Sequence, residues 1–447
     1  MNRRDDPYAR AIAYLYGLGN ELLAMKLGLL SVTALLEALG EPQKTFPSVI
    51  VAGTNGKGST SCMIDSIARN AGLSTGLYTS PHLIAIEERV RVDGAPISRD
   101  RFVAHAERVR LAGEALADDG RLPAPPTFFE QMTAIAFLEF AEQRVDLAVL
   151  EVGLGGRLDA TNVVQPVVAV VTPIALDHQK YLGDTLAEIA AEKAAVIKPC
   201  TAAVIAHQPL EALDPLMRRC LESDVLPVFC GEPVIHHSEN GRFTFTYETE
   251  ADRYDRLVVG LRGRHQVENA MVAVHTAEAL RHAGFGITRE AITAGLISAE
   301  WPGRLEMVLG APPVLLDGAH NVAGARALRA YLDEFCHCPV TLVFGALEDK
   351  QIPEMAAELF PAATSVVLTH PASPRAADMT ALGSGLPSAR AGRRPAVAPG
   401  IEEALGIAYR VTPRDGLIVV AGSLYLVGEA KARLAKGAPY APVERRQ

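Results

Sequence analysis

The chain has 447 residues, which is too many for one ordinary hydrophobic core and predicts two domains of unequal size. Apolar residues make up 49% of the chain and charged residues 21%, the balance of a globular protein in water. The net charge of −9 provides no general basic surface, which excludes nucleic-acid binding as the main function.

The N-terminus and the cysteines indicate the cellular compartment. Residues 1–6 carry charges with no apolar leader segment after them, and no apolar run approaches the roughly 18 residues that cross a membrane. The six cysteines are scattered, and the close pair Cys336 and Cys338 lacks a second pair at zinc spacing. We therefore expect a cytoplasmic protein with reduced thiols and no membrane partner.

A glycine-rich loop follows the first predicted strand. Residues 8–39 carry apolar side chains at helical spacing, and the apolar run 46–51 predicts the strand. The loop after it contains one lysine and reads Gly53, Thr54, Asn55, Gly56, Lys57, Gly58 and Ser59. Glycines let backbone N–H groups cradle phosphate oxygens, and the lysine reaches the β- and γ-phosphates. The loop predicts a nucleotide triphosphate site, although Gly58 stands where the general P-loop pattern has Ser or Thr.

Strands and helices alternate after this loop. Residues 147–151, 167–172 and 203–206 are apolar, β-branched runs that predict strands, and residues 127–143 and 185–197 predict helices. This alternation indicates an α/β fold with a mostly parallel sheet. Ligands of such sheets bind beyond the carboxyl ends of the strands, so the residues that follow each strand are the candidates for chemistry.

Ser80 and Glu151 are the first candidates. A carboxylate at a strand end can hold Mg²⁺ on the β- and γ-phosphates, because this ion takes one or two carboxylates together with phosphate oxygens and water. The glycine-rich residues 152–156 allow a ligand close to the backbone, and Arg157 can neutralise a phosphate or a carboxylate. A solvent-facing Glu151 and a capped turn at Ser80 are the alternatives.

His178 and Lys193 are two further candidates. His178 follows the predicted strand 167–172, where it would be either a metal ligand or a hydrogen-bonded structural residue. Lys193 lies among apolar residues of the predicted helix 185–197. From spacing alone we expect a plain exposed lysine whose stem snorkels to solvent.

The pattern changes in the last third of the chain. Residues 242–261 alternate polar and apolar side chains and predict antiparallel strands, and a helix follows over 267–283. Trp301, Pro302 and Gly303 interrupt both patterns. We therefore expect domains over residues 1–298 and 299–436, with a tail over 437–447. Strands of the second domain are predicted at 314–316, 341–344, 366–368 and 417–420.

Arg304, Asp317 and His320 are the polar candidates of the second domain. Asp317 and His320 follow the predicted strand 314–316, and Arg304 lies just past the predicted boundary. An Asp suits ribose hydroxyls and an Arg suits phosphate, so Arg304 and Asp317 would clamp a nucleotide from the opposite side. Interdomain salt bridges are the equal alternative.

Five motifs, in order along the chain, resemble those of the folylpolyglutamate synthase/dihydrofolate synthase family within the Mur ligase superfamily. They occupy residues 53–59, 79–83, 127–130, 151–162 and 317–321. The glycine after Lys57 is similar to this family's own variant of the P-loop. The resemblance implies a P-loop, Mur-ligase-like central domain with a mostly parallel sheet, and a smaller C-terminal Rossmann-like α/β domain.

The resemblance also implies a metal site. Ser80, Glu151 and His178 match the family's Mg²⁺ ligands, and one or two ions would be bound. Lys193 matches a lysine that the family carries N-carboxylated. A carbamate there would turn a cation into a metal-binding anion, which is the opposite of the exposed lysine expected from spacing.

The implied nucleotide site combines both domains. Residues 53–59 would hold the phosphates of ATP, and Asn269 would contact the adenine side. Arg304 and Asp317 would complete the site, and His320 would act in catalysis.

A surface for the pteroate part of a folate is implied as well. Lys26 stands where bifunctional members of the family carry an acid. The residues of this surface are Met25, Lys26, Leu27, His82, Thr127, Phe128, Phe129, Glu130, Arg157, Leu158, Asp159 and Ala160.

The implied reaction is ATP-driven amide formation. A carboxylate of dihydropteroate, of a folate, or of both in turn attacks the γ-phosphate, and L-glutamate then displaces phosphate from the acyl phosphate. Lys57 and the Mg²⁺ ligands would supply positioning and charge neutralisation. The expected partners are these small molecules, and we expect a monomer. A Mur-type ligase for a different acid and amino acid, and a nucleotide-switched protein that hydrolyses ATP without ligation, are the alternatives.

Overall fold

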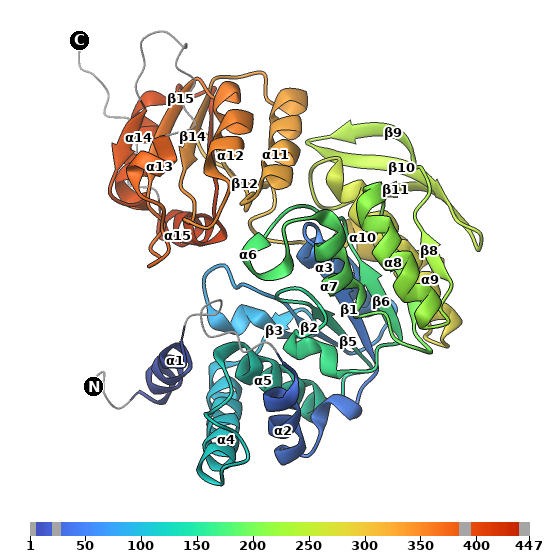
Figure 1. The fold of residues 1–447 in the computed structure, drawn as a ribbon. Helices are drawn as coiled ribbons and strands as arrows, with labels where there is room; N and C mark the ends of the chain where they lie inside the picture. Colours follow the sequence, from blue (N-terminus) through green and yellow to red (C-terminus); the bar gives the residue numbers. More distant parts are fainter. Residues whose placement is uncertain (1–5, 20–27, 384–394, 438–447) are drawn as a thin grey trace, which may run out of the picture. The chain divides into compact units, whose positions relative to one another are not determined.

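The computed structural model describes residues 6–19, 28–383 and 395–437. Contacts divide the chain into two compact units, each with helices and a sheet of its own (Figure 1). The first unit contains Met1–Pro233, Tyr247–Leu257 and Glu268–Ala299, and the second contains Val234–Thr246, Val258–Val267 and Glu300–Gln447. The predicted α/β fold class is confirmed.

The first unit is built on an eight-stranded sheet of order β4-β3-β2-β5-β1-β6-β7-β8. The six strands from β2 to β8 in this order are parallel, whereas β3 and β4 are antiparallel additions at one edge. The strands are β1 (Ser48–Ala52), β2 (Thr75–Tyr78), β3 (Val90–Val92), β4 (Ala95–Pro96), β5 (Leu147–Glu151), β6 (Val168–Val171), β7 (Ala202–Ile205) and β8 (Pro227–Phe229).

The register of the central strands brings the predicted site residues to one edge. Every residue of β1 and β5 is buried, as expected for apolar strands covered on both faces. Val51 of β1 lies opposite Glu151 of β5, and Tyr78 of β2 lies opposite Leu150. The loops after β2, β5, β1 and β6 therefore all leave the same edge of the sheet.

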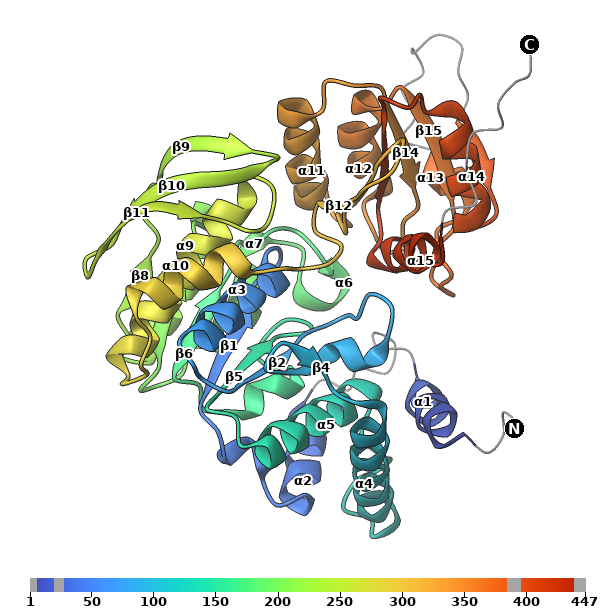
Figure 2. The ribbon, with the colours of Figure 1, turned by 180° about the vertical axis from the view of Figure 1, so that it is seen from behind.

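Helices cover both faces of this sheet. Those of the first unit are α1 (Pro7–Gly17), α2 (Leu30–Ala38), α3 (Lys57–Asn70), α4 (Arg99–Asp118), α5 (Phe128–Gln143), α6 (Gln179–Leu182), α7 (Leu186–Ala194), α8 (Leu210–Glu222), α9 (His265–His282) and α10 (Arg289–Ser298). Helices α3 and α10 lie side by side (Figure 2). A Cβ on Gly295 of α10 would come within 2.4 Å of the Ile67 backbone, so a glycine is needed for this close approach.

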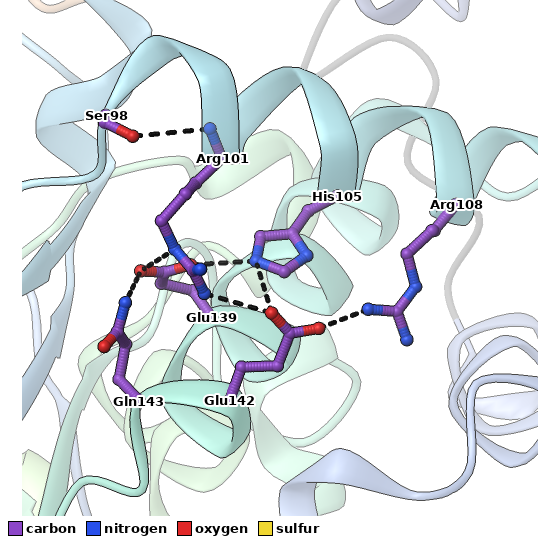
Figure 3. Close-up of polar contacts among 7 residues, drawn as sticks. All are labelled: Ser98, Arg101, His105, Arg108, Glu139, Glu142 and Gln143. Carbon is purple, nitrogen blue, oxygen red and sulfur yellow. Dashed lines mark hydrogen bonds and ion pairs between the residues drawn. The ribbon is translucent and has the colours of Figure 1, made fainter.

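Helices α4 and α5 are joined by a polar network (Figure 3). The carboxylate of Glu139 in α5 is buried, and its Oε2 lies 2.8 Å from His105 Nε2 of α4. Arg101 Nε donates to both oxygens of the same carboxylate, at 2.9 and 2.8 Å. Burial alone would raise the pKa of Glu139, but the hydrogen bonds from His105, Gln143 and Arg101 outweigh it and lower the pKa.

A three-stranded sheet of order β11-β10-β9 forms from β9 (Val234–Glu239), β10 (Arg242–Glu248) and β11 (Arg253–Val258). Strands β10 and β9 are antiparallel, which agrees with the alternation predicted from residue 242 onward. The sequence did not predict β9 because nearly all of its side chains are exposed and no polar/apolar alternation marks it.

The second unit contains a six-stranded sheet of order β12-β13-β17-β14-β15-β16. All of its pairs are parallel except β12 with β13. Its strands are β12 (Glu306–Val308), β13 (Val314–Leu316), β14 (Val340–Phe344), β15 (Ser365–Thr369), β16 (Ala396–Ala398) and β17 (Leu417–Ala421), and its helices are α11 (Val322–Phe335), α12 (Ile352–Leu359), α13 (Met379–Gly383), α14 (Ile401–Val411) and α15 (Leu424–Ala435). Within the described part of the chain, no helix has the length and apolar character needed to cross a membrane.

Candidate active site

The glycine-rich loop between β1 and α3 has a backbone that only glycine adopts easily. Gly53 and Gly56 have φ angles of 141° and 85°. A Cβ on Gly53 would lie 1.9 Å from the Thr172 hydroxyl oxygen, and one on Gly56 would lie 2.3 Å from Asn269 Oδ1. The structure therefore brings Asn269 of α9 against the predicted phosphate loop.

Hydrogen bonds to the loop after β6 hold this phosphate loop in place. The N–H groups of Thr54 and Asn55 donate to the Pro173 carbonyl at 3.0 and 3.2 Å. The Thr54 hydroxyl accepts from the Ala175 N–H at 3.1 Å. The loop conformation is thus set by its neighbour in the sheet.

Lys57 begins α3 and folds back over the loop. Its Nζ donates to the carbonyl oxygens of Gly53 and Thr54, both at 3.2 Å. Gly56 is the N-cap of α3, and no side chain caps this helix. An uncapped N-terminus with a lysine beside it favours an anion, which agrees with a phosphate site. Gly58 and Ser59 are buried in the first turn.

Glu151 and Ser80 lie together at the carboxyl ends of β5 and β2. The Ser80 N–H donates to Glu151 Oε2 at 3.0 Å, and Glu151 is only 6% exposed. The solvent-facing glutamate considered as an alternative is therefore wrong. The peptide bond between Ser80 and Pro81 is cis.

His178 lies after β6, at the start of α6, with φ of 51°. Its N–H donates to Asp177 Oδ1 at 2.9 Å, and its Nε2 lies 3.9 Å from the same oxygen. Across residues 6–19, 28–383 and 395–437, no three or more His, Cys, Asp and Glu side chains gather to hold a metal ion. A metal here would need the Ser80 hydroxyl and non-protein oxygens beside Glu151, a donor set that suits Mg²⁺.

Lys193 is buried, and the exposed lysine expected from spacing alone is wrong. Its side chain is 4% exposed, and Nζ donates to the Gly53 carbonyl at 2.7 Å. The last turn of α7 packs against residues 156–162, which removes this position from solvent. Burial and then the positive charge of Lys57 lower the pKa of Lys193 to about 7, against the opposing charges of Asp177 and Asp159.

The loop after β5 is tied to the end of α7 at two points. The Arg157 N–H donates to the Glu192 carbonyl at 2.9 Å, and Arg157 Nε donates to Glu192 Oε1 at 3.0 Å. A Cβ on Gly156 would lie 2.7 Å from the Glu192 carbonyl oxygen. Glu192 and Lys193 are consecutive, so α7 contacts this loop and the phosphate loop with adjacent residues.

A hollow that is open to solvent collects most of the predicted pteroate surface. Residues from the start of α5 form one side of it, and residues from the loop after β5 form another. Its lining includes Thr127, Phe129, Glu130, Arg157, Leu158, Asp159 and Ala160, together with Gly28 and Glu192.

Of the other predicted residues of this surface, Met25, Lys26 and Leu27 lie outside the described residues, and His82 and Phe128 are not among the residues that line the hollow. Phe128 is 1% exposed, and its ring stacks on Tyr16 with centroids 5.5 Å apart. Phe128 therefore packs in the hydrophobic core.

Two carboxylates shape the walls of the hollow. Glu130 Oε2 accepts from the Thr127 N–H at 2.7 Å, forming a capping box at the start of α5. Asp159 accepts from the N–H groups of Gly153, Leu154 and Thr161, each at 3.0 Å, and from the Thr161 hydroxyl at 2.6 Å. Burial raises the pKa of Asp159 in spite of these bonds.

His82 and Arg89 form a pair that the sequence did not reveal. Arg89 Nε donates to His82 Nδ1 at 2.9 Å, and Arg89 is 1% exposed. Burial and then the charge of Arg89 lower the pKa of His82 to about 3, so the ring is neutral near pH 7. The run Glu87-Glu88-Arg89 looks like a solvated charged segment, and no sequence signal separates a buried arginine from such a segment.

In the second unit, Asp317 and Arg304 lie around Gly318. Asp317 is buried and accepts from the N–H groups of Leu305 and Ala319, both at 2.9 Å. Burial raises the pKa of Asp317, and Arg304 opposes this effect. A Cβ on Gly318 would lie 2.1 Å from Arg304 Nη1. The structure thus brings these two predicted residues together.

His320 follows on the same loop. Its Nδ1 lies 2.8 Å from the Gly318 carbonyl oxygen, which can only accept a hydrogen bond. Nδ1 therefore carries a proton in this arrangement.

Comparison with known families covers most of the chain. Residues 51–277 match the family described as the Mur ligase middle domain, and residues 303–424 match the Mur ligase glutamate ligase domain.

Two relatives illustrate the range of lengths. The dihydrofolate synthase/folylpolyglutamate synthase of Bacillus subtilis is 36% identical over 427 residues, which are 93% of this chain and 97% of that protein. The probable bifunctional folylpolyglutamate synthase/dihydropteroate synthase of Haloferax volcanii is 39% identical over 435 residues. This match covers 95% of the present chain but 50% of that relative, so the chain spans about half its length.

Solved structures are similar over nearly the whole chain. The Mycobacterium tuberculosis folylpolyglutamate synthase complexed with ADP has a TM-score of 0.87 at 33% identity, covering 97% of this chain and 99% of that one. The E. coli FolC protein in complex with DHPP and ADP has a TM-score of 0.84 at 29% identity, covering 98% and 99%.

Proposed function

The chain belongs to the folylpolyglutamate synthase/dihydrofolate synthase family of Mur ligases, and from this premise we propose that it uses ATP to add L-glutamate to a folate-type carboxylate. The reaction passes through an acyl phosphate. The substrate carboxylate attacks the γ-phosphorus of ATP and ADP leaves. The amino group of L-glutamate then attacks the acyl carbon and phosphate leaves.

One observation carries this proposal above all. Two consecutive residues of α7 contact the two loops that the reaction must bring together. Glu192 accepts a hydrogen bond from Arg157 of the loop after β5, which lines the hollow, and Lys193 donates to the Gly53 carbonyl of the phosphate loop. An acid bound in the hollow and a triphosphate bound at the glycine-rich loop would then be neighbours. Positioning of this kind supplies much of the catalysis in phosphoryl transfer.

The residues around the phosphate loop have distinct tasks in this scheme. Lys57 Nζ, now held by the Gly53 and Thr54 carbonyls, turns to the β- and γ-phosphates when ATP binds. Residues 53–59 and the N-terminus of α3 hold the phosphates. Asn269, which lies against Gly56, contacts the nucleotide from α9.

We also propose that Glu151, Ser80 and His178 hold Mg²⁺, in one or two sites. Bound there, the ion would neutralise charge on the β- and γ-phosphates. Lys193 fits N-carboxylation because its pKa of about 7 leaves much of the amine neutral near physiological pH, and the neutral amine is the form that combines with carbon dioxide. Its carbamate would be a further ligand.

The second unit supplies further proposed contacts. Arg304 and Asp317 would bind the nucleotide, and His320 would act in catalysis. Their support is local: Asp317 and Arg304 converge on Gly318, and His320 follows on the same loop. We further propose that the protein acts in the cytoplasm as a monomer.

A coupled assay of ADP formation tests the proposed function. We expect ADP to form at a substantial rate only when L-glutamate and either dihydropteroate or a reduced folate are both present. Activity with both acids would make the enzyme bifunctional. ADP formation that is independent of glutamate would favour a non-ligating ATPase, and activity with other acids only would favour a different Mur-type ligase.

The change Glu151→Gln tests the metal assignment. Gln keeps the shape of the side chain and an oxygen that accepts from the Ser80 N–H, but it removes the charge. We expect kcat to fall on the order of 100- to 1,000-fold, the loss typical when one charge-stabilising group is removed. Thermal unfolding should stay at the wild-type temperature. A variant with wild-type kcat and an unchanged dependence on Mg²⁺ would contradict the assignment.

A further inference from the structure

Arg89 is a buried arginine that the proposed mechanism does not use. It ends the short 3-10 helix Ile86–Arg89. Its carbonyl accepts from the Thr79 N–H at 3.0 Å, and its Nε donates to His82 Nδ1 at 2.9 Å. One residue therefore closes the loop 79–89 through both its backbone and its side chain.

The surroundings of Arg89 hold its guanidinium in one orientation. Its Cζ lies 5.3 Å from the centre of the Phe128 ring, at the start of α5. The same ring stacks on Tyr16 of α1, with an angle of 12° between the planes. A planar guanidinium packed on an aromatic ring loses little further freedom when it forms a hydrogen bond.

The rest of the loop is held from the other side. The Glu88 carboxylate accepts from the N–H groups of Leu83, Ile84 and Ala85 at 2.9, 3.1 and 2.9 Å. His82 precedes these residues and is half-buried. It is also two residues from Ser80, whose N–H bonds Glu151.

The Arg89 contact decides which nitrogen of His82 carries the proton. A guanidinium only donates, so His82 Nδ1 must accept and carries no proton. The neutral ring then has its proton on Nε2. A neutral N–H donor can orient a carboxylate without binding it as tightly as a cation would, which leaves the carboxylate able to attack.

We propose that Arg89 is a positioning residue for ligation, which fixes His82 in the tautomer protonated at Nε2 so that His82 offers a neutral N–H donor to the reacting carboxylate of the acid substrate. This inference rests on the proposed function. It assigns Arg89 no contact with substrate; Arg89 acts through His82.

A double-mutant cycle with Arg89→Gln and His82→Ala tests the coupling. We expect Arg89→Gln to lower kcat by about 10- to 100-fold, the range for residues that orient a functional histidine, with an unchanged KM for ATP. In the His82→Ala background the same change should cost nothing further. Losses that multiply, or a wild-type kcat for Arg89→Gln, would overturn the proposal.

Nuclear magnetic resonance of the full chain with nitrogen-15-labelled histidine gives a readout that needs no activity. We expect the His82 ring to be protonated at Nε2 in the wild type and to become a mixture of tautomers in Arg89→Gln. A wild-type ring protonated at Nδ1 would overturn the proposal.

Arg89→Lys covers the case in which Arg89→Gln does not fold, since it keeps the charge in the buried position. Lysine lacks the planar fork, so we expect a mixture of tautomers and a reduced kcat. A wild-type tautomer and kcat in this variant would contradict a role for the guanidinium. If the wild type formed no glutamate adduct, the proposed function would fail, whereas a working ligase unaffected at Arg89 would contradict this inference alone.

Discussion

Two glycine-rich loops follow neighbouring parallel strands in the first unit. They differ in whether the loop itself supplies the negative charge that its backbone N–H groups can bind. The loop 153–162, after β5, contains Asp159, whose carboxylate accepts three of the loop's own N–H groups. The loop 53–59, after β1, contains a lysine and no acid, and the helix after it starts without a side-chain cap. A carboxylate that accepts its own loop's N–H groups leaves fewer of them for a ligand, whereas a loop with a lysine and no acid is left to bind an anion from outside.

The change Gly56→Ala tests whether the conformation of the phosphate loop is needed to bind ATP. The added Cβ meets Asn269 Oδ1 at 2.3 Å, and φ of 85° is strained for alanine. The phosphate loop or Asn269 must move to relieve this contact, so we expect ATP to bind about 10- to 100-fold more weakly by titration calorimetry, a loss of roughly 1–3 kcal/mol in binding free energy.

Gly72→Ala is the matched control for this variant. Gly72 has φ of 84° at the end of α3, but a Cβ there would meet nothing within 4 Å. It should lose similar stability and keep the wild-type affinity for ATP. Equal losses of ATP affinity in both variants would show that backbone strain at any position has this effect, and would contradict a specific role of Gly56.

The change Asp159→Asn tests the loop 153–162, whose N–H groups bond its own carboxylate. An amide has one accepting oxygen where the carboxylate has two, so either the half-buried N–H groups of Gly153 and Leu154 or the buried N–H of Thr161 would lose their partner. We expect the free energy of unfolding to fall by about 1–3 kcal/mol. The KM for the acid substrate should rise while the affinity for ATP is kept. A loss confined to ATP binding would reverse the roles that we assign to the two loops.

The pH dependence of stability tests the support of α5, which forms another wall of the hollow. The pKa of Glu139 is lowered in the folded protein from its ordinary 4.5, so the folded state favours the charged form. This stabilisation is complete above pH 4.5 and is lost as the pH falls through the lower folded pKa. Glu139→Gln should therefore show a flatter loss of stability on acidification in urea titrations. If the variant kept the wild-type pH profile, Glu139 would be excluded as a source of the pH dependence of stability.

Arg157→Ala should have the smallest effect on stability. The pair with Glu192 is largely exposed on the arginine side, and the backbone bond between the two residues remains. We expect a change in unfolding free energy below about 1 kcal/mol. Loss of one charged contact to the acid would raise its KM by at most about tenfold. An unchanged KM for the acid substrate would show that Arg157 lines the hollow but does not help to bind this substrate.

The sequence predicted elements and loops better than it predicted burial. The strands of the central sheet and the residues after them could be read from apolar runs because parallel strands buried on both faces leave a continuous signal. Helix α5 begins at Phe128, one residue after the predicted start, because Thr127 serves as its cap.

Contacts between distant segments could not be read in this way. Lys193 is buried because Gly156 allows a loop 37 positions earlier to approach α7, and helical spacing does not carry that information. Phe128 and Phe129 are neighbours in the sequence, yet one packs in the core and the other lines the hollow. Arg89 lies in a charged segment, and its bond to His82 and its packing on Phe128, both with residues outside that segment, hold it in the interior.

Isotope transfer tests the central claim most directly, because it reports whether the phosphate loop and the acid hollow share one reaction. Dihydropteroate or a reduced folate would be labelled with oxygen-18 in its carboxylate and turned over with ATP and L-glutamate. Attack of the carboxylate on the γ-phosphate predicts one labelled oxygen in each phosphate released, measured by mass spectrometry. Phosphate that carries no label, formed at the same rate as ADP, would contradict the acyl phosphate and the account built on it.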